Sequence, residues 1–140
     1  MLLINEEYYK TFFESIKNAK TCILGFVYHD SIYFSVAGTK TDDLVFALRE
    51  AKNRGVIVKI LCQSYKQVEG FRPFVSEIKI AKGFKTMHSK AFCFDNAFLI
   101  AGSHNFTDNA MSINLEMSLT TQNMEEIDKF VRYFESIWQR

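Results

Sequence analysis

Residues 88–105 of this chain concentrate side chains that can attack or bind a phosphate. They read HSKAFCFDNAFLIAGSHN, and the fixed residues of the pattern His-x-Lys-x(4)-Asp-x(6)-Gly-Ser-x-Asn are His88, Lys90, Asp95, Gly102, Ser103 and Asn105. With roughly a one-in-twenty chance per fixed position, an accidental match is on the order of 10⁻⁸ per starting point. An imidazole beside amine, hydroxyl and amide donors suits attack on a phosphorus atom whose oxygens need stabilising. The pattern therefore indicates phosphodiester chemistry.

This motif resembles the HKD motif of the phospholipase D superfamily. Two flanking segments, AKNRGVIVKIL and AGSHNFTDNAMSINLE, resemble the small bacterial endonucleases of that superfamily. The resemblance covers about residues 19–138, with poor matches at 29–40 and 63–85. Some relatives carry two copies of the motif, but His29 and His104 lack a lysine two residues further on. One chain therefore holds half of the usual active site.

The resemblance implies a role for each polar residue. His88 would be the nucleophile and would form a covalent phosphohistidine that water later cleaves. Lys90 and Asn105 would donate hydrogen bonds to the non-bridging phosphate oxygens, and Ser103 would add another. Glu116, from the Asn-x-Glu segment of the family, would accept the second imidazole proton and so fix the tautomer. The alternative for Glu116 is a solvated side chain on a half-exposed strand.

Two other motif residues and the two remaining histidines are expected to act outside the attack on phosphorus. Gly102 is expected to let the backbone turn tightly and approach a phosphate. Asp95 is included among the catalytic candidates with a structural or orienting role, because its spacing from His88 puts it on the opposite face of a regular strand. His104 either lines the groove or points away from it, as strand alternation favours. His29 either stands near the site or is an exposed loop histidine.

A single histidine cannot conveniently attack phosphorus and protonate the leaving oxygen in the same step. The resemblance implies a two-fold homodimer in which His88, Lys90 and Asn105 of both subunits meet in one shared site. One His88 would attack, and its protonated counterpart would act as general acid and then as base for water. The pH profile would then be bell-shaped. Because Lys90 and Asn105 would stabilise the charge, we expect no metal, no cofactor and activity in EDTA.

Length and composition set the broad class. A chain of 140 residues predicts a single domain over residues 1–140. No apolar run approaches the roughly 18 residues that cross a bilayer, and the N-terminal MLLINEEYYK lacks the features of a secretory signal, so we expect no membrane span and a cytoplasmic location. Cys22, Cys62 and Cys93 are far apart in apolar runs, which predicts buried free thiols rather than disulfides or a zinc site.

The charge distribution is more informative than the net charge of +1. Residues 61–100 carry six Lys or Arg against three acids, and no acid occurs between Glu77 and Asp95. This stretch contains four lysines: Lys79, Lys82, Lys85 and Lys90. They create either a positive field beside His88 or a solvated edge that prevents strands from pairing wrongly.

Hydrophobic periodicity predicts helices over residues 5–19, from Thr41 to a stop at Gly55, and over about 123–138. The first helix would have Asn5 as its N-cap and an apolar face that includes Tyr9 and Phe13. Strands are predicted at 21–27, 56–62, 87–94, 97–101 and 113–120. Alternation in the last strand puts Asn114, Glu116 and Ser118 on a polar face and Leu115, Met117 and Leu119 in the core.

These elements predict an α/β fold, a mixed β-sheet flanked by helices on both faces as in a phospholipase D-like sandwich. The aromatic and basic residues of 63–85 suit either binding of single-stranded nucleic acid or a core with a lysine-rich rim. The extra segment 29–40 could form a strand or hairpin that shapes substrate access, or a packed insert.

The function favoured by the sequence is that of a metal-independent nuclease that cleaves DNA or RNA. The chain could also be the catalytic module of a longer enzyme whose DNA-recognition domain lies elsewhere. One alternative is a phospholipid phosphodiesterase or phosphatidyltransferase, although such relatives usually carry two motifs and membrane-associating segments. The other is a catalytically silent nucleic-acid-binding module, which the complete set of His88, Lys90, Asn105 and Glu116 argues against. The sequence does not distinguish DNA from RNA or single from double strands.

Overall fold

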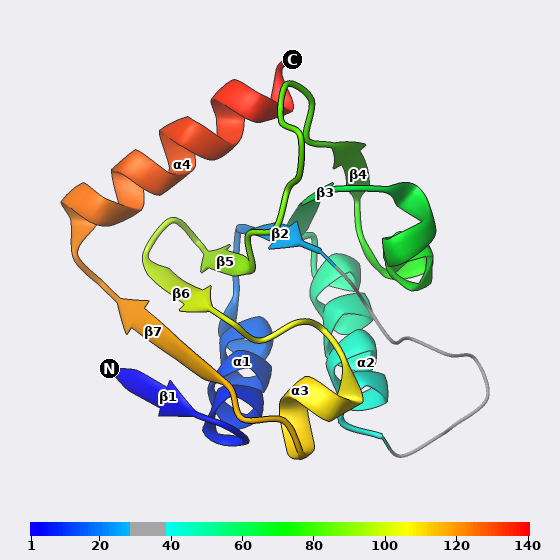
Figure 1. The fold of residues 1–140 in the computed structure, drawn as a ribbon, viewed down its shortest axis with the longest axis vertical. Coiled ribbons are helices and arrows are strands. Elements are labelled where there is room, and N and C mark those ends of the chain that lie inside the picture. Colours follow the sequence, from blue (N-terminus) through cyan, green and yellow to red (C-terminus); the bar gives the residue numbers. More distant parts are fainter. Residues whose placement is uncertain (29–38) are drawn as a thin grey trace.

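A computed structural model of the protein describes residues 1–28 and 39–140. Within these residues one seven-stranded sheet has the strand order β1-β7-β6-β5-β2-β3-β4 (Figure 1). The strands are β1 (Leu2–Ile4), β2 (Cys22–Val27), β3 (Ile57–Cys62), β4 (Glu77–Ile80), β5 (Ala91–Phe94), β6 (Phe98–Gly102) and β7 (Met117–Thr121). Strands β2, β3 and β4 run parallel, and all other neighbours are antiparallel. The predicted mixed sheet is confirmed.

Helices cover both faces of this sheet, as predicted. They are α1 (Glu7–Asn18), α2 (Lys40–Asn53), α3 (Asp108–Ser112), α4 (Met124–Trp138) and the 3₁₀ segment η1 (Tyr65–Phe74). The core under α1 and α2 centres on Phe12, whose ring makes edge contacts with Phe92 and Phe106 at centroid distances of 4.6 and 5.7 Å. The core under α4 centres on Phe134, which packs on Phe26 at 5.3 Å. None of these described helices has the length and apolar character to cross a bilayer.

The ends of helices α1 and α2 are set by local hydrogen bonds, and the start of α1 therefore differs from the prediction. Asn5 does not cap α1: it has a φ of 51°, and its side-chain oxygen accepts from the backbone N–H of Glu116 at 3.0 Å. Helix α1 therefore begins at Glu7; Tyr9 and Phe13 pack against the core as predicted, and Tyr8, which was not predicted, is buried there as well. Helix α2 is capped by Thr39 and ends before Gly55, whose φ of +93° confirms the predicted stop.

Several strands differ from the prediction because their partners set their length. The expected strand at 87–94 begins only at Ala91, because Ala91 pairs with Phe26 and β2 ends one residue later. Residues 87–90 therefore project beyond the end of β2. Strands β1 and β4 and helix α3 were not predicted, since segments of three to five residues carry little periodic signal.

The 63–85 region and the cysteines are also now placed. Phe71 of η1 is fully buried and Phe74 packs against the same core, so a core role explains these two rings. The cysteines are free, as predicted; Cys62 and Cys93 are buried and Cys22 is half-buried.

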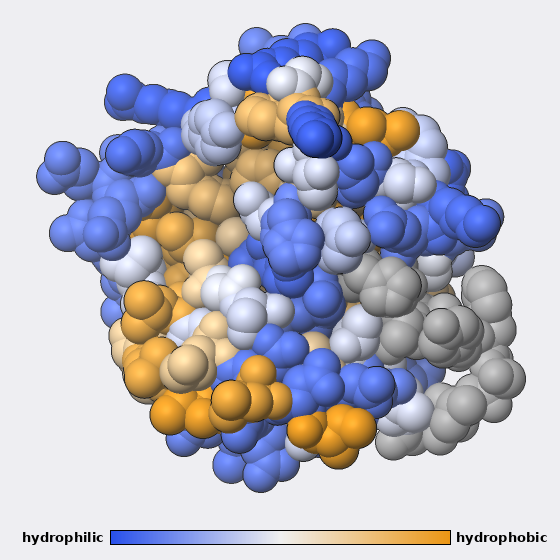
Figure 2. Space-filling view, viewed as in Figure 1, coloured by the Kyte–Doolittle hydropathy of each residue, from blue (hydrophilic) through white to orange (hydrophobic). Residues whose placement is uncertain are grey.

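The predicted orientation of β7 is wrong. Ser118 is 2% exposed and faces α1, whereas Leu115 and Leu119 are 84% and 62% exposed. Helix α4 packs over β2, β3 and β5 and leaves the outer strands of its side of the sheet uncovered. We call the exposed residues the β1–β7 apolar face: Leu2, Ile4, Leu115, Met117 and Leu119. Figure 2 shows apolar atoms gathered over this edge of the molecule.

A short turn holds the far end of β5. Asp95 and Asn96 connect β5 to β6 with φ values of 53° and 52°, as a type I′ turn requires. The Asp95 carboxylate accepts backbone hydrogen bonds from Lys20, Thr21 and Cys22 at 2.7–3.1 Å. Burial raises the pKa of this carboxyl, but the hydrogen bonds favour the charged form and hold the pKa below its ordinary value of 3.8. Asp95 therefore ties the β5–β6 hairpin to the start of β2.

We expect Asp95→Asn to lower the free energy of unfolding at neutral pH by about 1–2 kcal/mol, a value reduced for partial exposure. Asparagine tolerates the same φ, so the change isolates the charge. Because the folded-state pKa is depressed, Asp95 stabilises the protein above its ordinary pKa of 3.8 and loses that effect as the pH falls through the folded value. Urea unfolding from acidic to neutral pH should show the two proteins converging in acid. Asn96→Gly is the matched control, and a pH-independent difference between wild type and Asp95→Asn would contradict this role.

Candidate active site

His88 and Lys90 lie on the segment that projects past the end of β2. This segment lies at the carboxyl ends of the parallel strands β2 and β3, where open α/β sheets bind ligands. Met87 anchors the segment: its side chain is buried under α4, and its N–H donates to the side-chain oxygen of Gln63, which directly follows β3. His88 itself is exposed.

Lys90 and Tyr28 surround the His88 imidazole. The Lys90 ammonium lies 3.2 Å from Nδ1 and 3.4 Å from Nε2 of His88, and it donates to the His88 carbonyl at 2.9 Å. The ring of Tyr28, which directly follows β2, lies 4.6 Å from the imidazole and 5.1 Å from the Lys90 ammonium. An ammonium has no acceptor capacity, so a hydrogen bond from Lys90 requires an unprotonated imidazole nitrogen. Lys90 and Tyr28 thus hold the imidazole in place.

Lys90 is half-buried, and two effects act on the pKa of its ammonium in opposite directions. Burial lowers the pKa of its ammonium, while the negative charge of Glu116 raises it, and the net result is a pKa below the ordinary 10.5. Lys90 and Glu116 therefore belong to one electrostatic site, although they come from opposite ends of the motif region.

Glu116 is held by Ser103 rather than by His88. The Ser103 hydroxyl donates to the Glu116 carboxylate, whose other oxygen accepts from Asn114 at 3.3 Å. The pairing of β6 with β7 causes this, because Ser103 N–H donates to the Met117 carbonyl at 2.9 Å and so sits next to Glu116. Both Glu116 and His88 are described, and no hydrogen bond joins them within the chain. The expected tautomer-fixing bond is therefore not seen.

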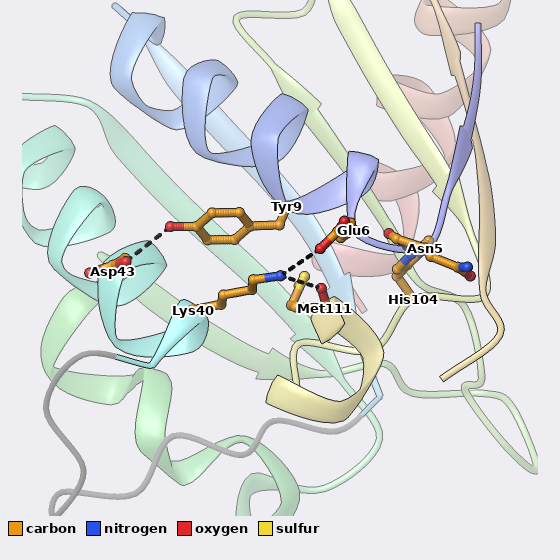
Figure 3. Close-up of polar contacts among 7 residues, drawn as sticks. All are labelled: Asn5, Glu6, Tyr9, Lys40, Asp43, His104 and Met111. Atoms are coloured by element: carbon orange, nitrogen blue, oxygen red, sulfur yellow. Dashed lines mark hydrogen bonds and ion pairs between the residues drawn. The ribbon is translucent and has the colours of Figure 1, made fainter. Parts of the chain in front are cut away.

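Asn105 is half-buried just after β6. Its side-chain oxygen is buried and has no hydrogen-bond partner among the described residues. An amide oxygen can only accept a hydrogen bond, so the NH₂ group of Asn105 is the part of this side chain that could donate to a phosphate. Helix α3, which follows Asn105, is fixed to α2: Lys40 donates to the Met111 carbonyl at 3.1 Å and pairs with Glu6 at 3.4 Å (Figure 3).

His104 does not line the site, so that alternative is wrong. It is buried between the Ser118 hydroxyl at 2.8 Å and the Asn5 carbonyl at 2.9 Å, and it stacks on Tyr8 at 4.1 Å (Figure 3 shows it beside Asn5). Burial lowers its pKa, which the Asn5 carbonyl and the charge of Glu116 only partly offset. His104 is a neutral structural residue that fixes the end of β6.

Gly102 is required for a different reason from the one predicted. A Cβ at this position would lie 2.2 Å from the Ser118 hydroxyl and 2.4 Å from the Met117 carbonyl. The absence of a side chain thus allows β6 to pack closely on β7. That close packing is what brings Ser103 to Glu116.

One further candidate, Asp95, is not brought to the site. Asp95 is separated from Lys90 by the length of β5, roughly 16 Å at ~3.3 Å per residue, and its carboxylate is used at the start of β2. Its role is structural, and the structure does not place it with the catalytic candidates. His29 lies outside the described residues. Within those residues no cluster of three or more His, Cys, Asp or Glu is arranged to hold a metal ion.

The lysine-rich stretch serves two purposes. Lys79 lies over the Trp138 ring at 4.6 Å, donates to the Trp138 carbonyl at 3.2 Å and pairs with Glu77 at 3.7 Å, so it holds the end of α4. Lys82 and Lys85 are exposed on the segment that leads to His88. These two lysines and Lys90 supply the positive charge on that side of the site.

Sequence reasoning missed Tyr28 and Gln63. Neither belongs to the motif, and their spacing from His88 in sequence gives no signal. Each directly follows a predicted strand of the parallel pair. The rule that ligands bind at the carboxyl ends of such strands was the one signal that could have identified them.

Comparisons with known proteins find the same fold. Two solved structures share the fold: NucT from Helicobacter pylori, with a TM-score of 0.81 and 19% identity, and the phospholipase D family member Nuc from Salmonella typhimurium, with a TM-score of 0.78 and 22% identity. Each comparison covers 99% of this chain and 94% of the other.

A curated relative is similar in sequence over a shorter stretch. It is a phospholipase D from Rickettsia bellii (strain RML369-C), 29% identical over 109 residues, which are 74% of this chain and 54% of that protein. The chain thus spans about half the length of the curated relative it matches. The model of the family described as "Cardiolipin synthase, PLD-like domain" matches residues 12–138. Because this match spans most of the sequence, the chain belongs to the phospholipase D-like family.

Proposed function

We propose that this chain is a metal-independent phosphodiesterase that cleaves DNA or RNA through a covalent phosphohistidine, in a site shared by two subunits and without a cofactor. One observation carries the proposal: a half-buried ammonium, Lys90, lies 3.2 Å from a nitrogen of an exposed imidazole, His88. The imidazole is open to substrate, and a fixed positive charge stands where the phosphate oxygens would arrive.

In this proposal each side chain has a defined task. A nitrogen of His88 attacks phosphorus and the bond to the leaving oxygen breaks. Lys90 and the Asn105 amide bind the non-bridging oxygens, while Ser103 is oriented by Glu116. The leaving oxygen takes a proton from His88 of a second subunit, which then removes a proton from the water that cleaves the phosphohistidine. Glu116 balances the charge of Lys90 across the site.

The β1–β7 apolar face supports the dimer. It carries four exposed large apolar side chains on the adjacent strands β1 and β7 and a fifth, Leu115, just before β7, a concentration that marks an interaction surface rather than scattered surface residues. We assign a second copy of the chain as its occupant, because the site in one chain has a single catalytic histidine. Two residues of this face, Leu115 and Met117, flank Glu116 in the sequence.

A lipid substrate is the second candidate. The family description and the printed name of the Rickettsia relative refer to phospholipid chemistry, and the same histidine chemistry acts on phospholipids. The endonuclease-like sequence around the motif and the cations Lys82 and Lys85 favour nucleic acid. We further propose that residues 1–140 act as one domain; any sequence recognition would belong to another domain in a longer protein.

The first test determines the substrate, the nucleophile and the metal requirement in one set of assays. We expect wild type to cleave labelled DNA or RNA in EDTA, because Lys90 and Asn105 supply the charge stabilisation. His88→Ala should abolish cleavage, and Lys90→Ala should slow it by about 10²–10³-fold. Gel assays on single- and double-stranded DNA and RNA measure this.

Lys52→Ala is the matched control, since Lys52 is an exposed lysine on α2 outside the site, and it should retain most activity. Cleavage that disappears on chelation would contradict the metal-free mechanism. Release of headgroups from phospholipid vesicles without cleavage of any nucleic acid would select the lipid candidate. Tight binding of nucleic acid with no cleavage would select the silent module.

The shared site is tested by mixing subunits. When wild type is co-refolded with rising proportions of His88→Ala, each mixed dimer has a single His88 side chain and should be inactive. We therefore expect activity to fall with the square of the wild-type fraction, and analytical ultracentrifugation should show dimers. A linear fall in activity would mean that each subunit acts alone.

Tyr28 is expected to act as a positioning residue, since its ring contacts both His88 and Lys90. Tyr28→Leu should lower kcat by about tenfold to a hundredfold, because the orientation of the nucleophile is lost. It should also expose Lys90 to water and raise the pKa of its ammonium toward 10.5, which an NMR titration of the lysine signal measures. Tyr28→Phe keeps the ring and should restore both properties. An unchanged pKa of Lys90 in Tyr28→Leu would assign Tyr28 to packing alone.

A further inference from the structure

A small pocket adjoins His88 on the side of helix α4. Its volume is about 80 Å³, and His88 forms part of its wall. Its floor is apolar and comes from three elements: Phe26 of β2, Met87 of the projecting segment and Ile137 of α4. All three floor residues are buried. No acidic side chain is among the described residues that line it. Because His88 forms part of the wall, a ligand in the pocket lies next to the phosphodiester that His88 attacks.

Two aromatic rings stand at the rim of this pocket. Phe84, from the segment after β4, is 40% exposed, and Tyr133 of α4 is 51% exposed. The guanidinium of Arg140 lies 5.1 Å from the Phe84 ring centroid and is held by the Lys82 carbonyl at 3.2 Å. The pocket thus combines an apolar floor, exposed ring surfaces and positive charge at its outer edge. Both rings are exposed to solvent beside the nucleophile, so they are available to a partner that stacks on them.

We propose that this pocket binds the nucleobase adjoining the phosphate that His88 attacks, an inference that rests on the function proposed above. A nucleobase is flat and polarisable and is followed by further phosphates, which matches rings on the rim and cations beyond them. A base reaches such a pocket only when it is unstacked and unpaired. The pocket therefore gives the site a preference for single-stranded over double-stranded nucleic acid.

The test compares Phe84→Ala and Tyr133→Ala with wild type on three substrates: a single-stranded oligonucleotide, its duplex, and the same single strand with one abasic residue. On the intact single strand each variant should raise KM by about tenfold, because a stacking surface is lost. The kcat should change little, since neither ring touches the reacting atoms. At the abasic position the variants and wild type should cleave equally, because there is no base to bind.

Tyr133→Phe should behave as wild type, and Phe46→Ala, which removes a 55% exposed ring from α2 outside the pocket, should have no effect. If wild type cleaves nucleic acid but neither alanine variant changes KM on the single strand, the pocket assignment is overturned while the proposed function stands. A wild type that cleaves no nucleic acid overturns both. Variants that lose activity only on phosphatidylglycerol vesicles would assign the pocket to a lipid chain instead.

Discussion

The antiparallel pairing of β5 with β2 is the constraint on which the rest of the structure depends. Phe26 pairs with Ala91 at one end of this ladder, so the chain before Ala91 has no partner on the β2 side and projects from the sheet, held on the other side by the Gly102 N–H, which donates to the Lys90 carbonyl at 3.1 Å. That projection carries His88 and Lys90. At the other end the Asp95 carboxylate binds the backbone at the start of β2. One four-residue strand thus fixes the position of the candidate nucleophile and is itself fixed at its far end.

The second pairing, of β6 with β7, assembles the other half of the site. Gly102 has no side chain where β7 approaches, and this closeness places Ser103 beside Glu116. His104, buried between Ser118 and Asn5, holds the same junction from the opposite face. The charge of Glu116 then reaches Lys90, where it partly offsets the effect of burial on the ammonium. The charges of Lys90 and Glu116 therefore offset each other, although no direct ion pair joins these two described residues.

The two faces of the sheet are covered unequally, and this asymmetry explains most of the exposed apolar surface. Helices α1 and α2 cover one face, while α4 covers the other only over its central strands. The outer strands therefore expose the β1–β7 apolar face, and the small pocket beside His88 opens where α4 meets the projecting segment. In the proposed function the first surface receives a second subunit and the second receives substrate. Both surfaces are consequences of a single helix that is too short to cover the whole sheet.

The sequence by itself determined the motif, the fold class and the longer elements, because fixed spacing and hydrophobic periodicity are local properties. Helix α4 and the parallel strands β2 and β3 were predictable from residues within each segment. Tertiary structure alone decided which face of β7 is buried, since that depends on how far α4 extends over the sheet. It also decided the partners of Glu116 and the presence of Tyr28 beside His88. Those contacts join segments 13 and 60 residues apart, and their distances are set by strand register, which no single segment encodes.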